Sequence, residues 1–155
     1  MSRICSRGNK TTELALAKLF RAHRIMDWRR HLEIRGRAAL PRGPNYSLRA
    51  QSTQRKDGTA RQHRPTFCVK PDFVFNHARL AVFVDGCFWH GCPKHATQPA
   101  NNRAFWRRKL AGNQQRDQLV NRSLRKAGWQ VLRIWECDLA RRSGVCLRRI
   151  QRAFG

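Results

Sequence analysis

Two aspartates flank a pair of short apolar runs in the middle of the chain. Asp72 stands just before the run 73–75, and Asp85 closes the run 80–84, with four residues between the runs. This pattern predicts a β-hairpin, and antiparallel pairing brings both carboxylates to the same end of it. Two carboxylates with nearby backbone carbonyls suit Mg²⁺, which can polarise a phosphodiester and activate water. The alternative is that both aspartates only end strands and cap turns.

Cysteine and histidine gather directly after the second run. Cys87, His90, Cys92 and His95 lie within nine residues of one another, and Cys137 ends a later apolar run. Three thiols and one imidazole form a tetrahedral zinc set, and the strand that ends at Cys137 could lie beside the hairpin. The spacing leaves open which histidine is the ligand. The other one, next to the carboxylates, would act as a general acid or base. Plain packing of the cysteines is the alternative reading.

Aromatic residues stand between these candidate ligands and among basic residues. Phe88 and Trp89 lie inside the Cys/His loop, which is too tight to bury both rings, and Trp106 is followed by Arg107, Arg108 and Lys109. Exposed rings on a basic surface can enter a base stack and kink a duplex. Phe88, Trp89 and Trp106 are therefore candidates for intercalation, with core packing the alternative for Trp106.

The charge balance indicates a polyanionic partner. The chain has 33 Lys and Arg against 9 Asp and Glu, a formal net charge of +24. Nucleic acid is the simplest partner, because each neutralised phosphate releases counterions. An Arg-rich surface without a ligand is the alternative. The sequence has no apolar run long enough for a membrane span and no apolar signal core near its start, so we expect a cytoplasmic protein.

The hydrophobic pattern predicts an α/β domain that spans residues 1–155. Residues 35–67, rich in Arg, Pro, Gly and Ser, are expected to form a long basic loop insertion. The other expected elements are a helix over 13–24, a strand over 25–34, the hairpin, a loop over 86–101, a helix over 102–127 ended by Gly128, a strand over 129–135 and a helix over 142–154.

Several segments resemble the very-short-patch (Vsr) mismatch-repair endonucleases. The resemblance covers most of the chain outside about 35–67, and the Gly-Cys-Phe-Trp-His string at 86–90 is its most specific part. The other similar segments are Pro71-Asp72-Phe73-Val74-Phe75, Val82 to Asp85, Gly91-Cys92-Pro93, Phe105-Trp106 to Asn113, Arg116-Asp117, Gly128 to Cys137, and Met1 to Ile4 with Thr12-Glu13-Leu14.

The resemblance implies a restriction-endonuclease-like fold with a central mixed sheet flanked by helices. It implies Mg²⁺-dependent nicking of double-stranded DNA, on the 5′ side of the thymine in a T:G mismatch. Asp72 would be the main Mg²⁺ ligand, Val84 would offer a backbone carbonyl, Glu13 would lie close by, and His90 would be the catalytic histidine. Structural Zn²⁺ would bind Cys87, Cys92, His95 and Cys137, and the intercalating rings would be Phe88, Trp89 and Trp106.

The sequence also departs from the best-known Vsr pattern. Asp85 stands where that pattern has histidine, which adds a candidate metal ligand or changes the catalytic balance. The Cys-Pro-x-His arrangement at 92–95 differs from other members. We also expect this protein to lack the longer N-terminal arm that can grip the minor groove in other members. Two alternatives follow: a Vsr-like defence or restriction nuclease with another target, or an inactive zinc-stabilised DNA-binding module. We expect a monomer, because mismatch nicking is asymmetric, and the sequence does not reveal any repair-protein partner.

Overall fold

A four-stranded mixed sheet forms the centre of the molecule. The structure, a computed structural model, describes residues 10–37, 66–95, 99 and 101–154. Strand order is β1-β4-β5-β6, in which β5 and β6 run parallel and the other neighbours antiparallel. The elements are α1 (Lys10–Ala22), β1 (Trp28–Arg30), β2 (Ile34–Arg37), β3 (Thr66–Val69), β4 (Phe73–Phe75), β5 (Leu80–Asp85), α2 (Arg103–Lys126), β6 (Gln130–Trp135), α3 (Glu136–Arg141) and α4 (Ser143–Arg152).

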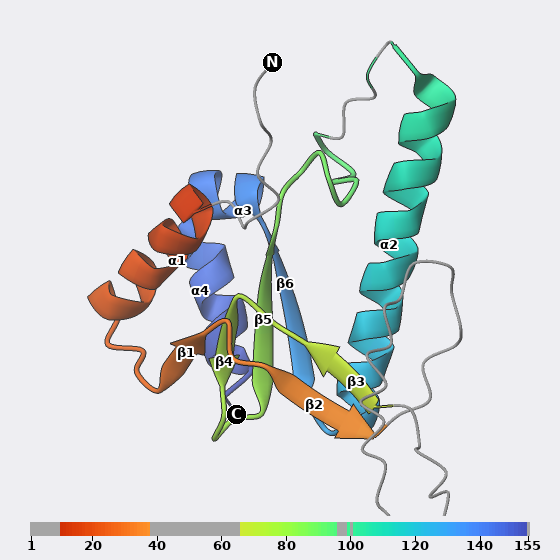
Figure 1. Ribbon diagram of the computed structural model, residues 1–155. Helices are drawn as coiled ribbons and strands as arrows, with labels where there is room; N and C mark the ends of the chain where they lie inside the picture. The colour runs from red at the N-terminus through yellow and green to blue at the C-terminus, as the bar shows by residue number, and fades with distance from the viewer. Residues whose placement is uncertain (1–9, 38–65, 96–98, 100, 155) are drawn as a thin grey trace, which may run out of the picture.

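Helices cover both faces of this sheet, as expected for the restriction-endonuclease-like fold. Figure 1 shows α1, α3 and α4 on one side and the long α2 on the other. Alternation along the strands separates two cores. Phe73 and Val82 pack toward α1 and α4 with Phe20, whereas Val74 and Ala81 pack toward α2.

The predicted hairpin is confirmed. Strands β4 and β5 pair antiparallel with Phe73 opposite Val82 and Phe75 opposite Leu80. The turn closes where the Arg79 N–H donates to the Asn76 carbonyl over 3.1 Å, with Arg79 at a φ of 44°. Strand β6 then lies beside β5 in parallel, with Asp85 opposite Trp135, so the chain after β6 arrives next to the Cys/His loop.

The single strand expected over 25–34 is wrong. The structure has two strands instead, β1 on the edge of the main sheet and β2 in a separate two-stranded sheet. The break falls at His31, which adopts a φ of 51°. A left-handed residue cannot continue an extended strand, so the chain changes sheet there.

The expected loop over 35–67 is wrong at both of its ends. Strands β2 and β3 pair antiparallel, from Ile34 opposite Val69 to Arg37 opposite Thr66. Ile34 and Phe67 are buried against the α2 side of the sheet, and this burial holds the two ends together. Most of the predicted insertion, residues 38–65, lies outside the described residues.

The C-terminal half follows the prediction with one addition. Helix α2 matches the expected helix and ends before Gly128, whose φ of +80° is the left-handed conformation that favours glycine. The expected final helix over 142–154 is confirmed as α4, and the addition is the short helix α3, which begins directly after β6. Cys146, Leu147 and Ile150 form the buried face of α4, whereas Val145 is 39% exposed.

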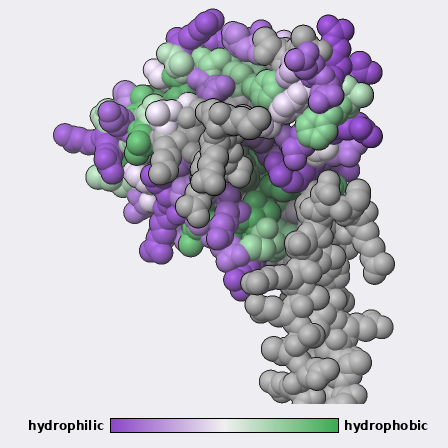
Figure 2. Space-filling view, turned by 45° about the horizontal axis from the view of Figure 1, so that its top comes forward, coloured by the Kyte–Doolittle hydropathy of each residue, from purple (hydrophilic) through white to green (hydrophobic). Residues whose placement is uncertain are grey.

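None of the helices in the described ranges is long and apolar enough to cross a membrane. Figure 2 shows one face of the molecule, on which hydrophilic residues predominate and hydrophobic residues gather in smaller patches between them.

Candidate functional site

The first side-chain cluster combines α1, the break after β1 and the start of β4. Glu13, His31 and Asp72 each offer one ligand atom, and these atoms lie within 4.8 Å of one another. Glu13 is 3% exposed and pairs with His31 Nε2 at 3.2 Å and with the Arg30 guanidinium. Two carboxylates and one imidazole are a donor set that fits a divalent cation.

The end of β5 connects this cluster to a second one. The Val84 N–H donates to Asp72 Oδ2 over 2.7 Å, and the next residue, Asp85, lies 3.7 Å from His90 Nδ1. His90 Nδ1 makes a shorter contact of 2.6 Å with Asp117 Oδ2 on α2. The structure therefore brings Asp72 and Asp85 to the same end of the hairpin but gives them different partners.

Burial and ion pairing set the charge state of these carboxylates. Burial raises the pKa of Asp72 above its usual value, against the hydrogen bond from Val84. Burial also raises the pKa of Asp85, although Arg133 Nη1 lies 2.7 Å from it and opposes the shift. Burial has the same effect on Asp117, but the hydrogen bond from His90 and the charge of Arg133 outweigh it and lower its pKa. Asp117 is thus a carboxylate that accepts the Nδ1–H of His90.

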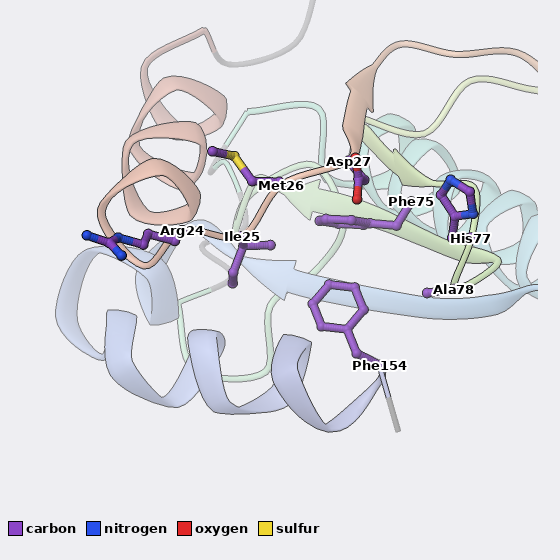
Figure 3. A pocket seen from close by; sticks show the side chains of 8 residues that line it. All are labelled: Arg24, Ile25, Met26, Asp27, Phe75, His77, Ala78 and Phe154. Carbon is purple, nitrogen blue, oxygen red and sulfur yellow. The ribbon is translucent and has the colours of Figure 1, made fainter.

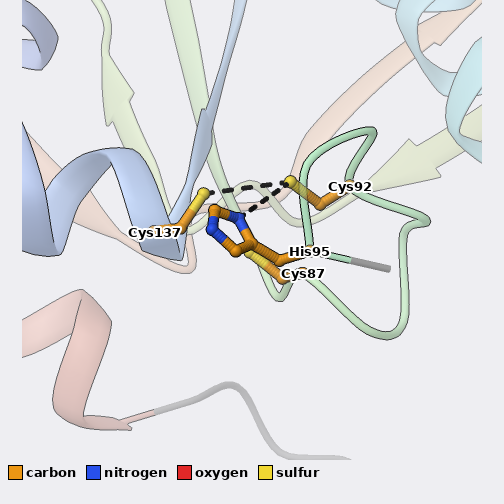
Figure 4. Close-up of side chains that lie close together, drawn as sticks. All are labelled: Cys87, Cys92, His95 and Cys137. Atoms are coloured by element: carbon orange, nitrogen blue, oxygen red, sulfur yellow. Dashed lines mark hydrogen bonds between the residues drawn. The ribbon is translucent and has the colours of Figure 1, made fainter. Parts of the chain in front are cut away.

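The third cluster contains Cys87, Cys92, His95 and Cys137, whose ligand atoms lie within 4.8 Å of one another. Figure 4 shows the four side chains converging, with Cys92 Sγ 3.8 Å from Cys137 Sγ and 3.9 Å from His95 Nδ1. Tetrahedral zinc with bonds of about 2.3 Å to sulfur separates its ligands by about 3.8 Å, so this donor set fits zinc. Of the two histidines that the spacing left open, His95 is in this cluster.

The thiols of this cluster differ in acidity. Burial raises the pKa of Cys92, but hydrogen bonds from the Lys94 backbone and from His95 outweigh it and lower the pKa to about 6. Burial raises the pKa of Cys87 to about 12. One thiolate is therefore ready at neutral pH, whereas Cys87 must lose its proton when a metal binds.

Backbone contacts fix the loop between β5 and the Cys/His cluster. Glu136 Oε1 accepts the Cys87 N–H over 2.7 Å, and Asn113 Nδ2 donates to the Trp89 carbonyl over 3.0 Å. Gly91 has a φ of +66°, and the Gln114 amide occupies the space that a Cβ there would need. The loop that contains His90 is thus tied to both α2 and α3.

The three candidate intercalating rings lie together on the molecule. Ring centroids are 5.0 Å apart for Phe88 and Trp89, 5.3 Å for Phe88 and Trp106, and 5.9 Å for Trp89 and Trp106. All three are partly exposed. Phe105 is 53% exposed and lies 5.4 Å from Trp106, so an aromatic cluster from the loop and α2 faces outward.

A polar hollow of about 200 Å³ opens beside His90. Its lining residues are Asp85, His90, Gln114, Asp117, Gln118, Asn121, Arg133 and Trp135. A larger, more apolar hollow of about 320 Å³ lies at the turn end of the hairpin, where Phe75 and Phe154 stand side by side (Figure 3). The titratable clusters are thus separated from the larger hollow by the length of β5.

Sequence reasoning missed three residues of the site. Asp117 has a recognisable signal, because Asn113, Asp117 and Asn121 recur every four residues and form a polar stripe on α2. Arg133 interrupts an apolar strand, which is a second usable signal. His31 has no sequence signal, since its place beside Glu13 depends on the break between β1 and β2.

These features define an α/β domain with a Cys₃His cluster beside a carboxylate and imidazole site. A family profile described as DNA mismatch endonuclease Vsr matches residues 44–96. The chain is 57% identical over 68 residues to Type II nicking enzyme V.NaeI of Lentzea aerocolonigenes, a match that covers 44% of this chain and 41% of the relative. It is 40% identical to Type II nicking enzyme V.NmeDIP of Neisseria meningitidis serogroup C, over 54% of this chain and 58% of that one.

The chain is thus similar to Vsr endonucleases and to Vsr-like nicking enzymes over about half of its length. It is also 39% identical to DNA mismatch endonuclease Vsr of Escherichia coli strain K12, over 45% of this chain and 46% of that enzyme. The matches therefore span about half the length of these relatives.

Proposed function

We propose that this protein is a DNA endonuclease that nicks one strand of a duplex by hydrolysing a phosphodiester. The observation that supports this best is the pairing of two clusters at one end of β5. The Val84 N–H holds Asp72 in the first cluster, and the neighbouring Asp85 contacts His90 in the second. A cation site and a histidine base so close together suit attack of water on phosphorus. We also propose that the chain acts as a single domain and as a monomer.

His90 is the general base in this proposal. Asp117 Oδ2 receives the Nδ1–H, so Nε2 keeps a lone pair that can take a proton from water. His90 is 22% exposed and lines the polar hollow, which lets water and a phosphate reach it. The water oxygen forms a bond to phosphorus while one P–O ester bond breaks, and the departing oxygen gains a proton.

A divalent cation, which we propose is Mg²⁺, would be held by Asp72, with Glu13 and the Val84 carbonyl nearby. When bound, it would polarise the phosphodiester and stabilise the charge on the departing oxygen. Burial gives the site its preference for a cation, because the Glu13 and Asp72 carboxylates lose solvation in the folded chain. Asp85 would contribute through His90, since its carboxylate is paired with Arg133.

We propose that Zn²⁺ at Cys87, Cys92, His95 and Cys137 has a structural role. Four protein ligands leave no position open for a substrate, as in other structural zinc sites. The first two ligands bracket Phe88, Trp89 and His90, so a metal would fix both the aromatic cluster and the base. The same loop is already tied down through Glu136, which is next to Cys137 in the chain.

The surface of α2 supports DNA as the substrate. The helix is about 36 Å long and passes the aromatic cluster and His90. Its exposed basic residues are Arg103, Arg107, Arg108, Lys109, Arg116, Arg122, Arg125 and Lys126. Asp117 is the one acid of this helix and it contacts His90 and Arg133, so no carboxylate of α2 opposes a phosphate backbone.

The DNA target is the part of the proposal on which the names of the relatives differ. One relative is named a mismatch endonuclease, whereas the relatives at 57% and 40% identity are named Type II nicking enzymes. We favour nicking 5′ of the thymine in T:G mismatches. The second candidate is a defence or restriction nuclease that nicks fully paired DNA.

A nicking assay separates these functions. End-labelled duplexes that are T:G mismatched, fully paired or methylated are incubated with Mg²⁺ and the wild-type protein. We expect cleavage of the thymine strand at the mismatch and intact complementary strands. Equal nicking of paired DNA would establish the second candidate. Binding without cleavage, in Mg²⁺ and in Mn²⁺, would show an inactive DNA-binding module.

Removing one ring of the aromatic cluster is expected to weaken mismatch recognition selectively. In Trp89→Ala, we expect nicking at the mismatch to fall about 10-fold, since stacking of an aromatic ring on a base contributes about 1–3 kcal/mol. Phe105→Ala is the matched control, because Phe105 is exposed next to the same cluster but is not one of the three candidate rings. Equal loss in both variants, measured as kcat/KM on mismatched duplex, contradicts intercalation by Trp89.

A further inference from the structure

Each side-chain nitrogen of Arg133 contacts a residue of the site around His90. It lies on β6, opposite Phe83 of β5, and its side chain is 19% exposed. Nη1 is 2.7 Å from Asp85 Oδ1, Nη2 is 3.0 Å from Asp117 Oδ1, and Nε donates to Asn121 Oδ1 over 3.1 Å. The guanidinium carbon lies 4.8 Å from the centroid of the Phe83 ring, so one face of the group is covered as well.

This arrangement uses properties that are specific to arginine. A planar guanidinium offers several donors in one fixed fork, whereas the lysine ammonium is a point charge on a flexible stem. The fork here joins a carboxylate on β5 to a carboxylate on α2, which are distant in sequence. A largely buried arginine such as Arg133 needs such partners, because an unpaired charge shielded from water is strongly unfavourable.

The ion pairs continue from Arg133 to His90. Asp117 is held at both of its oxygens, since Oδ1 faces Arg133 Nη2 and Oδ2 contacts His90 Nδ1 at 2.6 Å. Asp85 also lies near His90, at 3.7 Å from the same nitrogen. Two carboxylates are thus close enough to accept the same N–H of His90. Arg133 favours Asp117 as the acceptor, because it pairs with Asp85 and orients Asp117.

We propose that Arg133 is a positioning residue for hydrolysis, which holds the imidazole of His90 on Asp117 so that Nε2 faces the substrate. The inference rests on the proposed endonuclease function. It assigns the arginine in the apolar strand to the active site rather than to DNA binding. Without the guanidinium, the imidazole is free to turn between Asp85 and Asp117, and a smaller share of molecules has the base in the reactive orientation.

The test compares Arg133→Ala and Arg133→Lys with Arg122→Ala. Arg122 is an exposed arginine of α2, so its removal causes the same change in net charge and leaves the ion pairs of Arg133 with Asp85 and Asp117 in place. On the duplex that the wild type nicks, we expect kcat to fall about 100-fold in Arg133→Ala and about 10-fold in Arg133→Lys, with KM within threefold of wild type. In Arg122→Ala, we expect an unchanged kcat and a raised KM.

Chemical rescue separates positioning from a general loss of structure. Arg133 lines the polar hollow beside His90, so a small cation can enter the space that the truncated side chain leaves. We expect millimolar guanidinium to restore kcat in Arg133→Ala in a saturable manner and to leave Arg122→Ala unchanged. An unchanged kcat in Arg133→Ala, a rise in KM alone, or wild-type activity in Arg133→Lys would overturn the proposal.

A spectroscopic readout keeps the proposal testable without turnover. A histidine Nδ1–H held by a carboxylate gives a downfield proton resonance in NMR spectra, which we expect in wild type and in Arg122→Ala but not in Arg133→Lys. Retention of that resonance in Arg133→Lys would overturn the positioning role. If wild type shows the resonance but nicks none of the duplexes, the endonuclease function fails and the role of Arg133 at His90 is still decided.

Discussion

Replacing Asp72 with asparagine is expected to abolish nicking while the protein stays folded and bound to DNA. Asp72 belongs to the candidate cation site, and its carboxylate also accepts the Val84 N–H at the end of β5. A divalent cation contributes several kcal/mol of transition-state stabilisation, and each 1.4 kcal/mol is about tenfold in rate, so we expect a loss of about 10³-fold. Single-turnover nicking of the preferred duplex measures this loss.

Asparagine is the informative substitution because it keeps the local hydrogen bond. The amide oxygen can still accept the Val84 N–H, and the change removes a buried negative charge whose pKa burial already raises. We therefore expect the melting temperature of Asp72→Asn to stay at or above that of wild type. Asp27→Asn is the control, since Asp27 has a φ of 64°, which asparagine tolerates, and belongs to neither cluster. Wild-type nicking by Asp72→Asn would show that the cation site lies elsewhere.

The second large effect is expected from removing one ligand of the Cys₃His cluster. In Cys137→Ser, we expect the protein to lose its bound zinc, measured by elemental analysis of the purified protein. Structural zinc contributes on the order of 10 kcal/mol in small zinc peptides, and the loss of even about 4 kcal/mol lowers the melting temperature by about 10 °C in a domain of this size. Nicking should fall too, because the same loop positions His90.

Cys68→Ser is the matched control for this experiment. Cys68 is an exposed thiol on β3 whose sulfur contacts Glu33, and serine can keep that hydrogen bond. We expect one zinc per chain and an unchanged melting temperature in this variant. A full complement of zinc in Cys137→Ser, or equal zinc loss in Cys68→Ser, contradicts the proposed ligand set.

Zinc binding should also depend on pH in a defined direction. The pKa of Cys87 is raised to about 12 and that of Cys92 is lowered to about 6, so metal binding must displace a proton from Cys87 and, below about pH 6, from Cys92 as well. Zinc affinity should therefore fall more steeply as the pH drops through 6. Competition with a chromophoric chelator at several pH values measures this dependence, and an affinity that is constant from pH 5 to 8 contradicts it.

Local pattern was sufficient for the hairpin and for the clustering of ligands along the chain. Two short apolar runs identify β4 and β5, and the four residues between them fix which residues meet, so the common end of Asp72 and Asp85 follows from sequence alone. The long helix α2 and its end at Gly128 also follow from local signals. In the same way, Cys87, Cys92 and His95 are neighbours in the chain, and only Cys137 needed a fold to join them.

The partners of each side chain were decided by tertiary structure. Helix α1 places Glu13 beside Asp72, the left-handed turn at His31 moves that imidazole into the same cluster, and α2 places Asp117 against His90. None of these contacts joins residues close in sequence, so no spacing encodes them. Residue types and local periodicity thus determined what chemistry the chain can perform. Packing of helices on both faces of the sheet decided which carboxylate meets which base, because burial leaves each charge only the partners that the fold brings to it.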